Sequence, residues 1–229
     1  MEFEIYSYRF SKEIIEHPNY RQAYDELIET IQDCPLYFYP NKSSTNPNLD
    51  VVQQLTNAYF DRRLSVDFGW EYHPDATNIP DSNLKADFGK SFNELTVHVE
   101  VQFGNMARWY SDIFKFQTAY SDNLVDMGVC IVPFNELARR IDSNVANFER
   151  CLRELPSADM SITLPILLIG IKPGEETVQI NVSLSQFENI QQIIGKGKTN
   201  NKFKVVNGIL SGTPIEEIGP ASPIGPLPF

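Results

Sequence analysis

The chain has 229 residues, of which 42% are hydrophobic and 12% aromatic, enough to bury the core of one large domain or two small ones. Its net charge of −11 argues against a protein that binds nucleic acid through a general excess of positive charge. No apolar run approaches the ~20 residues that cross a bilayer, and the acidic, aromatic start MEFEIYSYRF is unlike a signal peptide. Three scattered cysteines without metal spacing suggest a reducing compartment. We therefore expect a cytoplasmic protein without membrane association.

Helices are predicted in the first third of the chain. Residues 19–34 carry apolar side chains at helical spacing, and Asn19 is a plausible N-cap. The shorter segment SKEIIEH precedes that helix, and residues 46–64 form another helical pattern. Residues 66–72 look extended, and the polar, proline-bearing stretch 73–83 is typical of a loop.

A pair of strands is predicted next, at residues 84–88 and 95–103. In the second segment Val97, Val99 and Val101 alternate with His98, Glu100 and Gln102, which is typical of a strand with one buried face. Residues two apart share a face, about 7 Å from each other. The polar face is either solvated, as on many antiparallel strands, or it carries a functional site.

The second half of the chain alternates between helical and strand-like patterns. Apolar runs predict buried strands at MGVCIVP and LPILLIGI, TVQINVSL alternates like a further strand, and helices are expected at 105–120, 134–141 and 144–155. The lysine-rich stretch GKGKTNNKFK is either a solvated turn between strands or a basic loop that touches phosphates. These elements predict an α/β fold with a central mixed β-sheet flanked by helices, as a single domain over 1–212 followed by a proline-rich tail over 213–229.

Two acidic residues suggest a metal site on the predicted strand pair. If the two strands are neighbours, Asp87 and Glu100 meet at one edge of the sheet, and Gly89 supplies a turn or bulge. Converging carboxylates can bind a divalent ion, and such an ion polarises a phosphate and lowers the pKa of a bound water. The amide of Gln102 could bind or orient an oxygen beside them.

The order of several motifs resembles a known family. DFGK, HVEVQFGN, MGVCIVP, ELARRIDSNVANFE and PILLIGI follow one another as in type II restriction endonucleases of the BglII, BstYI and BamHI kind, within the PD-(D/E)xK nuclease superfamily, and the resemblance spans roughly residues 5–173. It implies a homodimer that wraps double-stranded DNA and cuts both strands of a short palindromic site with Mg²⁺. Because these relatives share a GATC core, a GATC-containing site is the first expectation.

The resemblance also assigns roles to single residues. Asp87 and Glu100 become metal ligands, the carbonyl of Val101 a third ligand, and Gln102 positions the water or a phosphate oxygen. The Glu-x-Gln pattern follows the BglII and BstYI branch, where glutamine replaces the lysine of the general pattern and its neutral amide cannot stabilise charge as lysine does. The interval between Asp87 and Glu100 is longer than the family leads one to expect, which leaves Asp81 as the alternative first acid.

Contacts with DNA are expected beside the acids. Gly104 and Asn105 mark the start of a helix, which is either a site that binds a phosphate or reads adenine, or a helix start that Asn105 simply caps. The further DNA-contacting candidates are Arg108 on that helix, Ser143 and Asn144 where relatives read the outer base pairs, and Lys196 and Lys198 in the lysine-rich stretch. His98 shares the face of Glu100 and is either an auxiliary base, a phosphate contact or structural.

Two other functions are compatible with the same fold. One is a sequence-specific DNA-binding protein that does not cut, and the other is a repair nuclease that acts on branched or single-stranded DNA. The intact set of Asp87, Glu100 and Gln102 favours an enzyme.

Overall fold

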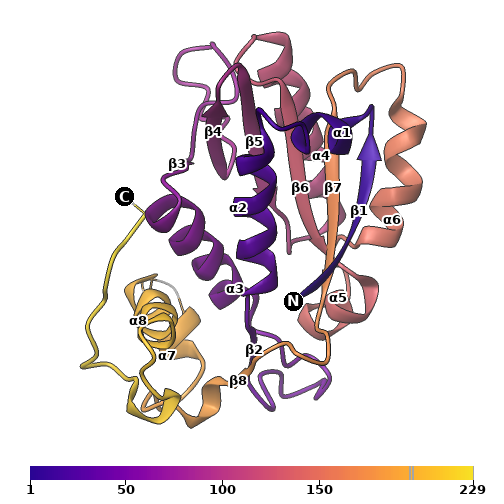
Figure 1. Cartoon of the computed structure of the whole chain (residues 1–229). Coiled ribbons are helices and arrows are strands. Elements are labelled where there is room, and N and C mark those ends of the chain that lie inside the picture. The colour runs from indigo at the N-terminus through magenta and orange to yellow at the C-terminus, as the bar shows by residue number, and fades with distance from the viewer. Residues whose placement is uncertain (196, 198, 229) are drawn as a thin grey trace.

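The computed structural model describes residues 1–195, 197 and 199–228. Its centre is a six-stranded sheet in the order β1-β7-β6-β5-β4-β3 (Figure 1). Strands β5, β6 and β7 run parallel, whereas β1, β4 and β3 join antiparallel, so the sheet is mixed as predicted. The strands are β1 (Glu2–Tyr8), β3 (Glu71–Tyr72), β4 (Phe88–Phe92), β5 (Leu95–Val101), β6 (Met127–Pro133) and β7 (Ile166–Lys172).

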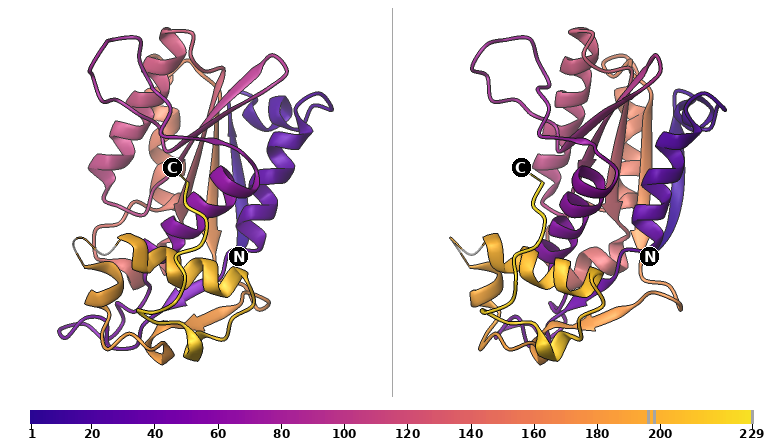
Figure 2. Two further views of the ribbon diagram at one scale, coloured as in Figure 1. Left: turned by 90° about the vertical axis from the view of Figure 1, so that its left-hand side faces the viewer. Right: turned by 60° about the vertical axis from the view of Figure 1, so that its left-hand side comes forward.

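Helices cover both faces of this sheet, which confirms the predicted α/β architecture. One face packs against α2 and α3, and the other against α4 and α6 (Figure 2). No helix in the described part of the chain is long and apolar enough to cross a bilayer. The helices are α1 (Ser11–Ile15), α2 (Arg21–Gln32), α3 (Gln53–Phe60), α4 (Met106–Ser121), α5 (Asn135–Ile141), α6 (Phe148–Glu154), α7 (Gln191–Ile194) and α8 (Thr199–Leu210), and α3 continues as a π-helix over Asp61–Asp67.

Strand β5 shows why its sequence alternates. Val97 and Val99 point into the core shared with α2 and α3, as the pattern predicts. The polar face is not solvated, because α4 covers it: His98 is 4% exposed, Glu100 2% and Gln102 8%. The alternation therefore separates an apolar core from a buried polar layer under α4.

Three local predictions near the strands are wrong. Strand β4 begins at Phe88 rather than at residue 84, and Gly89 lies inside it opposite His98 instead of forming a turn or bulge. A side chain at Gly89 would meet Pro74 at 2.9 Å and the His98 ring at 3.0 Å, so the packing there requires glycine. Asn19 does not cap α2, which begins after Tyr20. Strand β1, for which no strand was predicted, forms the sheet edge beside β7.

The C-terminal part differs more from the expectations. The lysine-rich stretch is not a turn between strands, because Lys202 and Lys204 lie in α8, while Lys196 and Lys198 fall outside the described residues. The strand expected in TVQINVSL shortens to β8 (Gln179–Asn181), which pairs with β2 (Leu36–Phe38) in a separate two-stranded sheet.

The proline-rich tail packs on its own chain. The amide of Asn207 in α8 donates to the carbonyl oxygens of Ile224 at 2.6 Å and Pro226 at 2.9 Å. Ile218 is fully buried. The boundary between a domain over 1–212 and a tail over 213–229 stays a prediction.

Candidate active site

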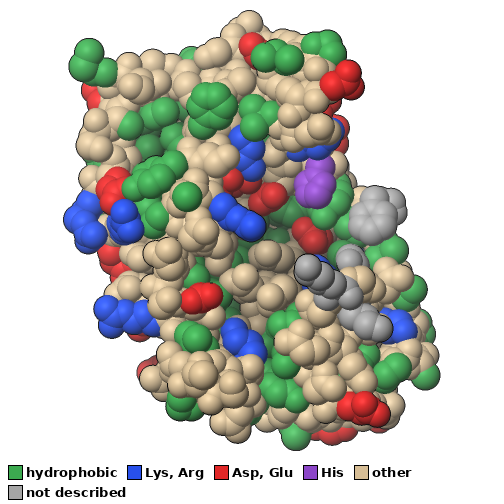
Figure 3. All heavy atoms as spheres, turned by 180° about the vertical axis from the view of Figure 1, so that it is seen from behind, with side chains coloured by type: hydrophobic (Ala, Val, Ile, Leu, Met, Phe, Trp, Pro, Cys, Tyr) green, Lys and Arg blue, Asp and Glu red, His purple; other side chains and the backbone are tan. Residues whose placement is uncertain are grey.

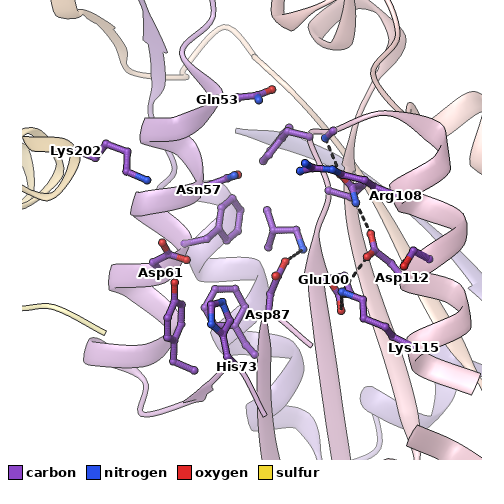
Figure 4. Close-up of a pocket in the computed structure, with 18 residues that line it drawn as sticks. Gln53, Asn57, Asp61, His73, Asp87, Glu100, Arg108, Asp112, Lys115 and Lys202 are labelled. Carbon is purple, nitrogen blue, oxygen red and sulfur yellow. Dashed lines mark hydrogen bonds and ion pairs between the residues drawn. The ribbon is translucent and has the colours of Figure 1, made fainter. Parts of the chain in front are cut away.

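A pocket of about 430 Å³ opens beside the ends of β4 and β5, between α3 and the first turns of α4, and α8 reaches it on the side of α3 (Figure 4). Acidic and basic side chains and a histidine gather near the centre of the face drawn in Figure 3. The residues that line the pocket are shown in Figure 4 and are Gln53, Asn57, Phe60, Asp61, Tyr72, His73, Asp87, Phe88, Glu100, Val101, Gln102, Phe103, Gly104, Arg108, Ser111, Asp112, Lys115 and Lys202.

The fold brings Asp87 and Glu100 together in this pocket. Phe88 pairs with Val99 across the hairpin, so the residues next to them, Asp87 and Glu100, lie at the same level. The backbone N–H of Val101 donates to Asp87 Oδ2 at 2.9 Å and holds that carboxylate at the end of β5. The long interval between the two acids is the length of the β4–β5 hairpin.

The alternative acid, Asp81, lies elsewhere. It has a positive φ of 62° in an exposed loop and lines a different pocket from that of Glu100. The geometry therefore favours Asp87 as the partner of Glu100.

Helix α4 supplies a lysine that the sequence motif does not contain. Lys115 Nζ lies 2.6 Å from Glu100 Oε1 and 3.0 Å from Asp112 Oδ1. Burial lowers the pKa of Lys115, but the two carboxylates overcome this and raise it above its usual value. Sequence reasoning missed this group, although Arg108, Asp112 and Lys115 form a polar stripe at i, i+4 and i+7 of the predicted helix.

Both polar atoms of the Gln102 side-chain amide form hydrogen bonds within the protein. Its Oε1 accepts from the backbone N–H of Gly104 at 2.6 Å, and its Nε2 donates to Asp112 Oδ2. The side chain therefore links the end of β5 to α4.

The acids fit a magnesium ion. Burial, followed by the charges of Asp87 and Asp112, raises the pKa of Glu100 well above its usual range, although Lys115 opposes the shift, and a bound cation would favour the ionised carboxylate. Among the described residues there is no cluster of three or more His, Cys, Asp or Glu side chains that could hold a metal. Mg²⁺ needs no such cluster, since it is usually held by one or two carboxylates together with waters and substrate phosphates. The Val101 carbonyl stays a predicted third ligand.

The predicted DNA-contacting residues at the start of α4 lie close together. Asn105 caps α4, its Oδ1 accepting from the N–H of Arg108 at 3.1 Å, so the capping interpretation is confirmed and a base contact stays a prediction. Val145 bridges to Asn105, and Ala146 N–H donates to Gly104 O at 2.8 Å. The exposed Ser143 and Asn144 therefore sit on a loop beside this helix start.

The two histidines near the site are placed differently, and His98 agrees with the structural alternative. His98 is buried outside the pocket, and burial lowers its pKa to about 4, so it is neutral at pH 7. His73, to which the sequence assigned no role, lines the pocket with a positive φ of 56° and stacks on Tyr72. Its backbone N–H donates to the carbonyl of Asp87 at 3.0 Å.

Two further charged residues reach the pocket from α3 and α8. Asp61 begins the π-helix, a feature that often occurs at functional sites, and Lys202 approaches it from α8 (Figure 4). Burial, followed by the charge of Asp87, raises the pKa of Asp61 to about 7, although Lys202 opposes the shift.

Replacing Asp61 by asparagine should stabilise the protein at alkaline pH. In the unfolded chain this carboxyl ionises near pH 4, whereas in the folded protein it keeps its proton up to about pH 7. Wild-type stability is therefore lost as the pH rises from 4 through 7, and Asp61→Asn should recover about 4 kcal/mol at pH 8 and less than about 1 kcal/mol at pH 4. Urea unfolding at both pH values measures the difference. Asp81→Asn in the exposed loop is the matched control, and equal behaviour of the two variants would contradict this assignment.

Carboxylates gathered in an open pocket at the edge of an α/β sheet are an arrangement that a metal-dependent hydrolase of phosphodiesters can use. A family model described as restriction endonuclease BglII/BglIII matches residues 3–171, and the chain belongs to this family. The resemblance seen in the sequence is thereby confirmed. The matched residues end before β8, α7 and α8.

Solved structures agree with this assignment at the level of the fold. The crystal structure of restriction endonuclease BglII complexed with a DNA 16-mer superposes with a TM-score of 0.63 at 22% identity, covering 77% of this chain and 81% of that chain. The structure of free BglII superposes with a TM-score of 0.56 at 23% identity, covering 77% and 82%. None of the curated proteins matches the chain.

Proposed function

We propose that the protein is a type II restriction endonuclease that hydrolyses phosphodiester bonds in double-stranded DNA at a short palindromic site, with Mg²⁺ as cofactor. The observation that carries the proposal is the meeting of Asp87 and Glu100 in one open pocket of a restriction-endonuclease fold. Family membership supports the activity, and the BglII structure with DNA supports duplex DNA as the substrate.

The residues of the pocket have two proposed roles, to hold the metal ion and to bind the DNA phosphates. Asp87 and Glu100, with the Val101 carbonyl, would hold Mg²⁺, which neutralises charge on the phosphate and lowers the pKa of a bound water. Arg108 and Lys202 line opposite walls and can bind phosphate oxygens on either side of the acids (Figure 4).

The loop beside α4 is proposed to select the DNA sequence. Ser143 and Asn144 lie exposed next to Asn105, where their side chains can reach base edges. A GATC-containing core is the first site to test. Lys196 and Lys198 remain proposed phosphate contacts, since they belong to the same stretch as Lys202.

Digestion of a plasmid with Mg²⁺, followed by sequencing of the ends, tests the proposal. Discrete fragments with identical termini are expected, and the termini give the recognition site. Degradation to short pieces would instead indicate a repair nuclease, and an intact plasmid with a band shift would indicate a protein that binds without cutting.

A palindromic site requires a two-fold symmetric dimer, and α4 offers a surface for one. Its outer side exposes Phe114 at 61% and Tyr110 at 47%, spaced four residues apart. The hydroxyl of Tyr110 donates to Glu154 of α6, which ties the two helices into one surface. We propose that the homodimer contact lies on this side of the molecule.

Phe114→Glu should therefore weaken dimerisation. A charge placed in a buried aromatic contact is expected to cost about 2 kcal/mol or more, which is at least about thirtyfold in the dimer dissociation constant. Sedimentation equilibrium measures this constant. Phe10→Glu, which changes another exposed phenylalanine, should leave it unchanged. A Phe114→Glu protein that dimerises like the wild type would place the contact elsewhere.

A further inference from the structure

The motif Glu100-Val101-Gln102 lacks the positive charge that a developing negative phosphate requires, because the amide of Gln102 is neutral. We propose that Lys115 of α4 supplies this charge and contacts the scissile phosphate or the attacking water, while Gln102 acts as a positioning residue through Asp112. This inference rests on the proposed function, since it assigns the cation of that same site.

The position of Lys115 is the first support. Its side chain is 14% exposed, lines the pocket and points toward Glu100 from α4 (Figure 4). The ammonium lies 2.6 Å from Glu100 Oε1, so it stands directly beside one of the two acids that meet at the proposed cleavage site.

The number of N–H donors on the Lys115 ammonium is the second support. Lys115 contacts two carboxylates among the described residues, Glu100 and Asp112, and an ammonium has three N–H bonds. The remaining N–H can donate to a phosphate oxygen or a water in the pocket. Three acids, Asp87, Glu100 and Asp112, surround this one lysine. One positive charge does not balance three carboxylates, so negative charge remains for a metal ion.

The contacts of Gln102 explain its role in this arrangement. Asp112 uses its two oxygens separately, Oδ2 accepting from Gln102 and Oδ1 facing Lys115. Gln102 is itself fixed by the N–H of Gly104. The chain of contacts from Gly104 through Gln102 and Asp112 sets the position of the lysine, so Gln102 has a function that does not require contact with DNA.

The test compares Lys115→Met with Lys90→Met. Lys90 also forms a shielded ion pair, 2.9 Å from Glu26, but outside the pocket. Cutting is followed in single turnovers with Mg²⁺, DNA affinity is measured with Ca²⁺, and folding by thermal unfolding. We expect Lys115→Met to lower the cutting rate about 10²- to 10³-fold with DNA affinity within about threefold, and Lys90→Met to cut like the wild type.

A double variant that moves the positive charge from position 115 to position 102 adds an independent readout. The double variant Lys115→Met/Gln102→Lys returns an ammonium beside Asp112 and should cut at least about tenfold faster than Lys115→Met. If Lys115→Met does not fold, Lys115→Gln replaces it, because an amide can still donate to both carboxylates without carrying charge.

The outcomes separate this inference from the proposed function. A wild-type protein that cuts no DNA refutes the proposed function. A wild type that cuts, together with a folded Lys115→Met or Lys115→Gln protein that cuts within about threefold of it, refutes the role of Lys115 alone. A loss of DNA affinity as large as the loss of rate would also overturn it, because Lys115 would then act in binding.

Discussion

Glu100→Ala is expected to lower the rate of DNA cutting by about 10³-fold or more while the protein still binds its site. The change removes a carboxylate proposed to hold the metal, whose stabilisation of the transition state is worth several kcal/mol. The change also removes a partner of Lys115, which lies 2.6 Å away, so thermal unfolding checks that the variant is folded. Single-turnover cutting and DNA binding with Ca²⁺ measure the two effects.

Glu26 provides the control for this experiment. It is also a buried glutamate, 7% exposed, but it pairs with Lys90 and accepts from the Trp70 indole N–H, away from the pocket. Glu26→Ala should cost stability and leave the cutting rate of the folded protein unchanged. If Glu100→Ala cuts within about tenfold of the wild type, or Glu26→Ala loses cutting equally, the site has been misplaced.

Phe116→Ala should lower the free energy of unfolding by about 3–5 kcal/mol, the usual cost of deleting a fully buried phenylalanine ring. The ring lies under α4 against Gly128 of β6, where even a methyl group on the glycine would come within 2.7 Å of it. Such close packing leaves a cavity when the ring is removed. Urea unfolding followed by tryptophan fluorescence measures the loss.

The matched change is Phe10→Ala, at a phenylalanine that is 75% exposed, and it should stay within about 0.5 kcal/mol of the wild type. A cost below about 1.5 kcal/mol for Phe116→Ala would mean that α4 is not seated firmly on the sheet. Because Lys115 precedes Phe116 on this helix, its position beside Glu100 depends on the same packing.

The local pattern of apolar and polar residues was sufficient to predict the central strands of the sheet. The apolar run at 127–133 predicts β6 with the bounds observed, and the alternation at 95–103 predicts β5, since both patterns follow directly from burial on a strand. Strand β1 is different. Its pairing partner β7 lies more than 150 residues away in the chain, and no local pattern carries that information.

The sequence by itself determined the family resemblance, the mixed α/β class and the candidate set of Asp87, Glu100 and Gln102. Only the tertiary structure decided that the polar face of β5 is covered by α4, that Lys115 faces Glu100, and that α8 brings Lys202 to the pocket. The physical reason is that helical spacing shows which side chains share a face, whereas the groups which that face meets depend on how the helix packs across the sheet.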